Sequence, residues 1–172
     1  MKSLVVYSSL TGNTKMVAEA IAEELGSDTK LVPVEEQPDA VGYDLIAVGF
    51  WVDKGTADQK TAMYLQNLTH TKIALFATLG ANPESTHARE SLDNAAKLLD
   101  ETNNVVGRFI CQGKVDPKLI ERMNKMFPAG HPHSMNEERR VRHEKASKHP
   151  DAQDLIHAKQ TFAQIKVDLA KG

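Results

Sequence analysis

The stretch YSSLTGNT, from Tyr7 to Thr14, stands between a short apolar run and a segment with helical periodicity. The run before it, Leu4 to Tyr7, does not alternate with polar residues, which is typical of a strand buried on both faces of a parallel sheet. The segment after it, Met16 to Leu25, repeats apolar residues at helical spacing, and Gly26 supplies a stop. The stretch is therefore predicted to turn a strand into a helix.

The rest of the chain continues this alternation of strands and helices. Further strands are predicted at 30–34, 44–50, 72–78 and 105–111, and further helices from about 58 to 67, 85 to 100, 117 to 126 and 151 to 169. The segments 35–42 and 51–58 are predicted to be connections. Strands that alternate with helices imply βα units with right-handed crossovers and a parallel sheet covered on both faces. The predicted fold class is α/β.

Length and composition predict one soluble domain over residues 1–172. The net charge of -2 favours neither a nucleic acid nor a membrane as partner. No apolar run approaches the roughly 18 residues of a transmembrane helix, and the N-terminus lacks a signal-peptide layout. The single cysteine, Cys111, excludes an intrachain disulfide and fits a reducing compartment. We therefore expect a cytoplasmic protein.

Three of the predicted loops should meet at one edge of the sheet. All strands of a parallel sheet end at the same edge, and ligands bind there in the crevice where the strand order reverses. The loops after the first, third and fourth strands span residues 8–14, 50–58 and 78–85. These three loops are the candidate ligand site.

The first loop contains groups that can hold a phosphate without a cation. A helix N-terminus supplies unpaired N–H groups and a partial positive charge of about half a unit. Gly12 allows a close approach of the backbone. Polar donors accompany it on the side chains of Ser9, Thr11, Asn13 and Thr14. The alternative is a capped turn without a ligand, in which Thr11 or Asn13 is the N-cap.

Other phosphate-binding motifs fit this loop poorly. A Walker loop requires G-x-x-x-x-G-K-[ST], which the chain lacks, and a dinucleotide fingerprint requires more glycines than Gly12. A phospho-acceptor receiver domain would have acidic residues where Ser8 and Ser9 stand. The loop therefore favours a terminal monophosphate held by neutral donors.

The loop resembles the FMN-phosphate loop of flavodoxins, T/S-x-T-G-N-T, residue for residue from Ser9 to Thr14. The words GFWVDKGTAD (49–58) and FATLGANP (76–83) stand where flavodoxins place the two loops that flank the isoalloxazine ring. They also resemble a flavodoxin-like subfamily of mainly anaerobic bacteria, one member of which is associated with bilirubin reductase. The resemblance covers roughly residues 1–115. It implies a flavodoxin-like three-layer sandwich: a five-stranded parallel sheet in the order 2-1-3-4-5, with helices on both faces and an extra helical excursion before the C-terminal helix.

The resemblance implies FMN as the cofactor and suggests how it is held. Trp51 or Val52 would pack on the flat, apolar isoalloxazine, whereas the alternative is a core or surface tryptophan. Gly55 would let a peptide turn toward flavin N5 as the redox state changes, or it is an ordinary turn glycine. The backbone of residues 78–80 would face the pyrimidine edge, or it forms a simple turn before a helix. The expected cofactor-binding residues, with no catalytic residue and no metal ligand, are Ser9, Leu10, Thr11, Gly12, Asn13, Thr14, Trp51, Val52, Lys54, Gly55, Thr78, Leu79 and Gly80.

Two features depart from the flavodoxin pattern. A cation at Lys54 would stabilise the negatively charged reduced flavin and raise its potential, whereas flavodoxins usually crowd the site with acids. In this chain the loop has two acids, Asp53 and Asp58, and one cation, Lys54. We therefore expect the low-potential couple of the flavin to be less negative than in strongly acidic flavodoxins. The loop 79–85 also lacks the aromatic residue that commonly covers the outer flavin face. That face is open, or the excursion or a partner covers it.

Residues 127–150 are predicted to form the polar surface excursion within the domain. The segment 131–150 has five Lys/Arg and three Glu and is locally basic. The favoured interpretation is a solvated helix and loop, and a docking surface for an acidic partner is an alternative. A metal site is the weakest alternative because H-x-H in a loop is a poor ligand pattern; its ligands would be His131, His133, His143 and His149.

Two further reactive side chains have ordinary interpretations. Cys111 is predicted to be a buried structural thiol, because no second cysteine exists to resolve a disulfide. His87 follows the third loop and is predicted to lie on a helix surface, with a proton donor at the flavin edge as the alternative.

The favoured function is an FMN electron carrier, which takes electrons from a reductase and delivers them to an acceptor enzyme. The predicted loops contain no nucleophile with its base, and the chain is too short for a separate nicotinamide domain. One alternative is an FMN-dependent reductase that acts directly on a small molecule such as a quinone or tetrapyrrole. The other is a non-flavin binding module that uses the same phosphate cradle.

Overall fold

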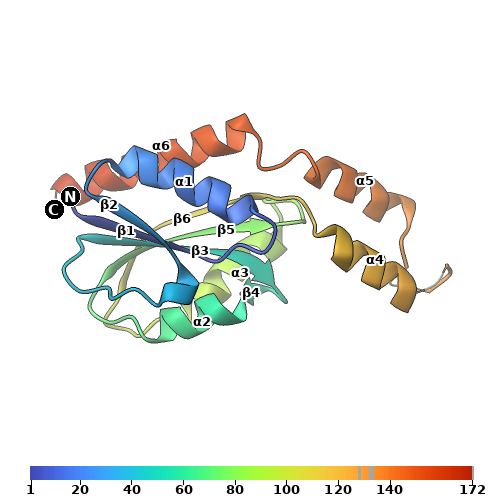
Figure 1. Ribbon diagram of the computed structural model, residues 1–172, viewed down its shortest axis with the longest axis horizontal. Coiled ribbons are helices and arrows are strands. Elements are labelled where there is room, and N and C mark those ends of the chain that lie inside the picture. The colour runs from blue at the N-terminus through green and yellow to red at the C-terminus, as the bar shows by residue number, and fades with distance from the viewer. Residues whose placement is uncertain (128, 132–133, 172) are drawn as a thin grey trace.

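Five parallel strands form the centre of the computed structural model, which describes residues 1–127, 129–131 and 134–171 (Figure 1). The strands lie in the order β2-β1-β3-β5-β6. This is the predicted order 2-1-3-4-5, counted over the parallel strands alone. The bounds are β1 (Ser3–Tyr7), β2 (Thr29–Pro33), β3 (Leu45–Asp53), β5 (Lys72–Leu79) and β6 (Asn104–Gln112).

Helices cover both faces of this sheet, as predicted. Figure 1 shows α1 (Asn13–Leu25) and α6 (Ala152–Lys171) on one face, and α2 (Gln59–Gln66) and α3 (Thr86–Ala96) on the other. Along each central strand, buried residues alternate between the two layers, because successive side chains of a strand point to opposite faces. In β1, Leu4 and Val6 join the core under α2 and α3, and Val5 joins the core under α1 and α6.

The segment 51–58 is not the connection that the sequence predicted. Strand β3 continues to Asp53, and β4 (Thr56–Ala57) turns back to pair with it antiparallel. Lys54 and Gly55 form the two-residue turn, with φ of 48° and 79°. Positive φ at both central residues is the requirement of a type I′ hairpin turn. A two-residue strand is too short to produce a periodic pattern, so β4 could not be predicted from the sequence.

Several helix boundaries also differ from the predictions. Helix α1 begins at Asn13, three residues early, and a short 3-10 helix, η1 (Val34–Glu36), follows β2. Helix α3 ends at Ala96 rather than at Asp100. The side chain of Asp100 accepts hydrogen bonds from the backbone N–H and the hydroxyl of Thr102, which closes a turn and keeps these residues out of the helix.

The helical excursion is confirmed, because the predicted segment 127–150 contains one helix, α5 (Glu137–Ala146). The helix before it, α4 (Pro117–Met126), was predicted separately, and Figure 1 shows both helices beyond the end of the sheet, away from the sheet and its covering helices. Helix α4 buries none of its residues, and α5 buries only Ala146. The chain then returns to the sheet through α6. Within the described parts of the chain, no helix has the length and apolar character needed to cross a membrane.

Candidate functional site

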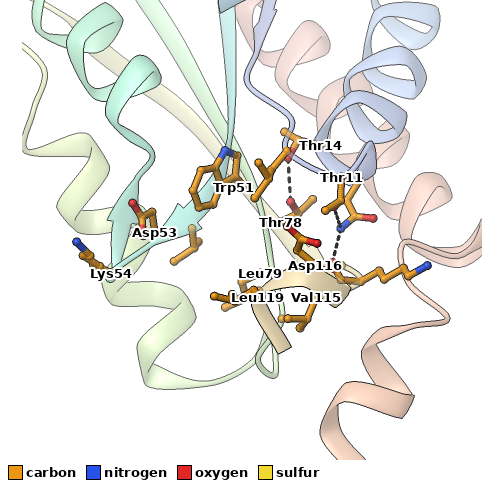
Figure 2. Close-up of a pocket in the computed structure, with 16 residues that line it drawn as sticks. Thr11, Thr14, Trp51, Asp53, Lys54, Thr78, Leu79, Val115, Asp116 and Leu119 are labelled. Carbon is orange, nitrogen blue, oxygen red and sulfur yellow. Dashed lines mark hydrogen bonds between the residues drawn. The ribbon is translucent and has the colours of Figure 1, made fainter. Parts of the chain in front are cut away.

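A cavity of about 270 Å³ lies where the strands end (Figure 2). It brings together the three predicted loops and a fourth segment that follows β6. Three residues predicted for the site, Ser9, Gly12 and Gly55, adjoin the cavity without lining it. The ten predicted residues that do line it are Leu10, Thr11, Asn13, Thr14, Trp51, Val52, Lys54, Thr78, Leu79 and Gly80.

The loop before α1 presents unpaired backbone N–H groups at the cavity. The residue before the helix is Gly12, whose φ of 92° suits glycine and which has no side chain to cap the helix. Ser9 Oγ accepts hydrogen bonds from the backbone N–H groups of Gly12 and Lys15, at 3.1 and 3.2 Å. Among the described residues, no acceptor forms a hydrogen bond with the backbone N–H groups of Leu10, Thr11, Asn13 and Thr14.

The predicted alternative of an N-cap at Thr11 or Asn13 is wrong. The side-chain amide of Asn13 donates to Thr11 Oγ1 at 3.0 Å and to the carbonyl oxygen of Lys114 at 2.8 Å. Both N–H groups of this amide are therefore used within the protein. Asn13 shapes the loop and ties it to the segment after β6, and only its backbone N–H is left for a ligand.

Thr14 and Thr78 form a buried link between the first and third loops. Their hydroxyl oxygens lie 2.9 Å apart, and both residues are buried. Thr14 is in the first turn of α1 and Thr78 is the penultimate residue of β5. Because buried hydroxyls need partners, this pair fixes the helix N-terminus against the strand end.

The opposite walls of the cavity are apolar. Figure 2 shows the ring of Trp51 on the side of the β3–β4 hairpin, with Leu79, Val115 and Leu119 across the cavity from it. Trp51 is half-buried in the extended end of β3. A flat aromatic wall facing aliphatic side chains suits a planar, largely apolar ring.

The hairpin turn is fastened to α3. The side-chain amide of Asn94 donates a hydrogen bond to the carbonyl oxygen of Gly55 at 3.0 Å. The peptide after Gly55 can therefore turn only if this bond breaks. Exposed His87 lies on the same helix and does not line the cavity, which agrees with the surface position predicted for it.

The family of the chain is settled by its match over almost the whole length. Residues 4–163 match the model of the family described as flavodoxin domain. This chain belongs to the flavodoxin domain family. The assignment confirms the family predicted from SSLTGNT, together with its fold and its cofactor, FMN.

Individual relatives of this flavodoxin domain agree with the assignment. The flavodoxin-like domain-containing protein BilS of Clostridioides difficile (strain CD3) is 35% identical over 162 residues, which cover 92% of each chain. Oxidised Flavodoxin 2 from Bacillus cereus has the same fold, with a TM-score of 0.57 and 16% identity over 99% of both chains. A flavoprotein in complex with FMN from Lactobacillus acidophilus NCFM has a TM-score of 0.52 and 22% identity, covering 63% of this chain and 92% of that one.

The sequence prediction missed the part of the cavity lining that follows β6. This strand also ends at the carboxyl edge of the sheet, so the rule that identified the other loops applied to its loop as well. A residue with a side chain at position 113 would press against Asn13, because its Cβ would lie 2.9 Å from Nδ2 of Asn13. The missed residues are Gly113, Lys114, Val115, Asp116 and Leu119. Asp53, predicted only as a charge near Lys54, also lines the cavity.

Formal charges around the flavodoxin cavity balance. Asp53 and Asp116 line it together with Lys54 and Lys114. Asp58, the other acid that was predicted to oppose the charge of Lys54, does not line the cavity. Its buried carboxylate caps α2 and accepts hydrogen bonds from Ser8 Oγ and from Thr61.

The remaining predicted side chains have structural roles. Cys111 is buried, as predicted, and burial raises the pKa of its thiol well above the usual range, which keeps it uncharged and unreactive.

In the described part of the excursion, His131, His143 and His149 do not gather into one group, and His133 lies outside the described residues. His149 instead lies beside Asp154, with Nδ1 2.6 Å from Oδ2. At the start of α6, the backbone N–H of Asp151 donates to the Asp154 carboxylate, and the backbone N–H of Asp154 donates to the Asp151 carboxylate.

Proposed function

We propose that this flavodoxin-domain protein binds FMN in the cavity at the strand ends and carries electrons between a reductase and an acceptor enzyme. The observation that supports this most strongly is one cavity that combines unpaired backbone N–H groups at a helix N-terminus with an aromatic wall. Bound FMN would supply the redox chemistry by taking up and releasing electrons. The protein would bind, orient and shield it.

The FMN phosphate would lie at the loop before α1. The N–H groups of Leu10, Thr11, Asn13 and Thr14 are without acceptors among the described residues, and the dipole of α1 favours a negative group there. The hydroxyl of Thr11 can also donate while its oxygen accepts from Asn13. Ser9 would act indirectly, by holding the N–H groups of Gly12 and Lys15.

The isoalloxazine would lie between Trp51 and the aliphatic wall. Trp51 and Val52 would contact one face, and Leu79 and Leu119 the other. The backbone of residues 78–80 would face the pyrimidine edge. Lys54 and Gly55 form the hairpin turn at the remaining side and would influence the ring from there.

A carrier is favoured over an enzyme because the described residues that line the cavity include no nucleophile paired with a base. Its titratable lining residues are Asp53, Lys54, Lys114 and Asp116, and Asp116 caps α4. The alternative, an FMN-dependent reductase of a quinone or tetrapyrrole, is supported by the outer wall. There an aliphatic residue, Leu119, stands 45% exposed where an aromatic cover would restrict access.

The experiment that separates these functions uses the FMN-loaded protein of residues 1–172, which we propose acts as one domain with 127–150 as an excursion. The protein is mixed with NADH or NADPH, first alone and then with a flavodoxin reductase. A carrier stays oxidised alone, becomes reduced when the reductase is added, and then reduces cytochrome c. Oxidation of either nicotinamide by the protein alone, accelerated by a quinone, would contradict the carrier and favour the direct reductase.

A further inference from the structure

The formal charge of the molecule is unevenly divided. We define the arm as residues 114–148, which include α4 and α5. Its sequence has nine Lys/Arg and five Asp/Glu, a net charge of +4, whereas the rest of the chain has 12 Lys/Arg and 18 Asp/Glu, a net charge of -6. A separation of this size orients an approaching charged protein before contact. The overall charge of -2 is therefore the sum of a basic arm and an acidic remainder of the chain, which we call the body.

Most of the basic groups of the arm are available. Lys125 pairs with Glu121 and Arg140 with Glu137 on the arm itself. Six exposed cations, in contrast, have no carboxylate within 4.0 Å among the residues that the structure describes. They are Lys114, Lys118, Arg122, Arg142, Lys145 and Lys148.

Helix α4 also has an apolar stripe beside these cations. Leu119 and Met126 are 45% and 64% exposed, and Met123 between them is half-buried. Spacings of three and four residues place these side chains on one face of a helix. Lys118 and Arg122 have the same spacing and form the neighbouring row. An apolar centre edged by charged groups is the usual composition of a protein–protein interface.

The stripe begins at the cavity. Leu119 and Val115 line the cavity wall opposite Trp51, and Leu119 is also the first member of the α4 stripe (Figure 2). The next turn of α4 leads away from the cavity, toward the end of the arm (Figure 1). A protein seated on this face would therefore reach the edge of the proposed flavin site.

We propose that the arm is the docking surface for an acidic redox protein that exchanges electrons at the cavity. This inference rests on the proposed function and names the chemistry of its partner: a protein with a one-electron centre near its surface, inside an acidic rim. In each encounter, the reduced flavin loses one electron and the partner's centre gains it. No covalent bond forms or breaks. The acidic body repels the partner elsewhere, and the arm attracts it.

The test uses rubredoxin, an acidic one-iron protein, as the probe and basic cytochrome c as its counterpart. Chemically reduced, FMN-loaded protein is mixed with each oxidised probe in a stopped-flow instrument at several salt concentrations. The arm variant is Lys118→Gln with Arg122→Gln. The matched control is Lys30→Gln with Lys72→Gln, two exposed lysines outside the arm.

With rubredoxin, the wild-type rate should fall as salt rises, and the arm variant should be about tenfold slower at low salt, within the range of electrostatic steering. The control variant should match the wild type, and the rate with cytochrome c should not fall in the arm variant. Rubredoxin rates that are equal in the arm and control variants would overturn the proposal.

A binding measurement separates this proposal from the proposed function. Calorimetric titration of FMN-free protein with rubredoxin at low salt should show binding that the arm variant loses and the control variant retains. Loss of FMN binding would overturn the carrier and leave this titration interpretable. Two outcomes would overturn the docking proposal: binding of anionic vesicles through the arm without rubredoxin binding, or a dimer of the chain that only the arm variant abolishes.

Discussion

The side chain of Asn13 is hydrogen-bonded to the backbone of Lys114, although the two residues are far apart in the sequence. Its amide donates to the Lys114 carbonyl oxygen at 2.8 Å. This bond joins the loop before α1 to the segment that leaves β6 and enters α4. The proposed phosphate site and the arm therefore share one contact, and the shape of one depends on the other.

Replacement of Asn13 by alanine should weaken FMN binding about fivefold to tenfold, because two hydrogen bonds that shape the loop are lost and each contributes about 1 kcal/mol or less. Fluorescence titration with FMN measures the change. Gln66→Ala, an exposed change at the end of α2, is the control and should leave the affinity unaltered. An unchanged affinity in Asn13→Ala would show that the loop keeps its shape without this side chain.

Gly80 is predicted to have no room for a side chain. A Cβ at this position would lie 2.4 Å from Cγ2 of Val115, which packs directly against it in the cavity lining. Gly80→Ala should therefore destabilise the fold by about 1–3 kcal/mol and loosen FMN, as overpacking does. Urea unfolding with and without FMN measures both effects. The double variant with Val115→Ala should recover most of the loss, and equal destabilisation of the single and double variants would exclude this contact as the cause.

Lys54 is predicted to raise the potential of the second one-electron reduction of FMN. Lys54→Ala should lower that potential by tens of millivolts, since one partly solvated charge nearby is worth about 1–2 kcal/mol and about 1.4 kcal/mol corresponds to 59 mV for one electron. Anaerobic redox titration gives the value. Lys54→Arg keeps the charge and should keep the potential. A potential that does not fall in Lys54→Ala would refute the role of this cation.

Tyr64 should make stability depend on alkaline pH. Burial raises the pKa of its phenol to about 12, from 10.0, and the hydroxyl donates to the Pro38 carbonyl at 3.0 Å. Above pH 10 the unfolded chain releases this proton and the folded protein keeps it, so the free energy of unfolding falls as pH rises toward 12. Tyr64→Phe should be less stable at pH 7 by about 1 kcal/mol. Its deficit should shrink above pH 10, and urea unfolding curves whose difference stays constant with pH would contradict this.

The sequence alone was sufficient for the parallel sheet and for most of the cavity. Buried strands such as β1 have unbroken apolar runs, and SSLTGNT combines a turn, a helix start and a family pattern in seven residues. These signals are local in the chain. They also predicted that Trp51 and Thr78 lie at the same edge of the sheet, because all parallel strands end there.

The features that the sequence did not reveal depend on contacts between distant segments. The loop after β6 has no motif, and its place at the cavity follows from the Asn13–Lys114 bond. The exclusion of Asp58 from the cavity depends on its hydrogen bond with Ser8, which no spacing rule predicts. The β3–β4 hairpin was concealed because β4 has only two residues.

One FMN should lie against Trp51, and this is measured by titrating the protein with FMN while recording tryptophan fluorescence. Trp51 is the only tryptophan of the chain, so its fluorescence reports on this wall of the cavity alone. FMN should quench this fluorescence saturably, with an end point at one FMN per chain, and the yellow flavin absorbance should stay with the protein after gel filtration. FMN that washes through, or FMN that is retained without any change in Trp51 fluorescence, would contradict it.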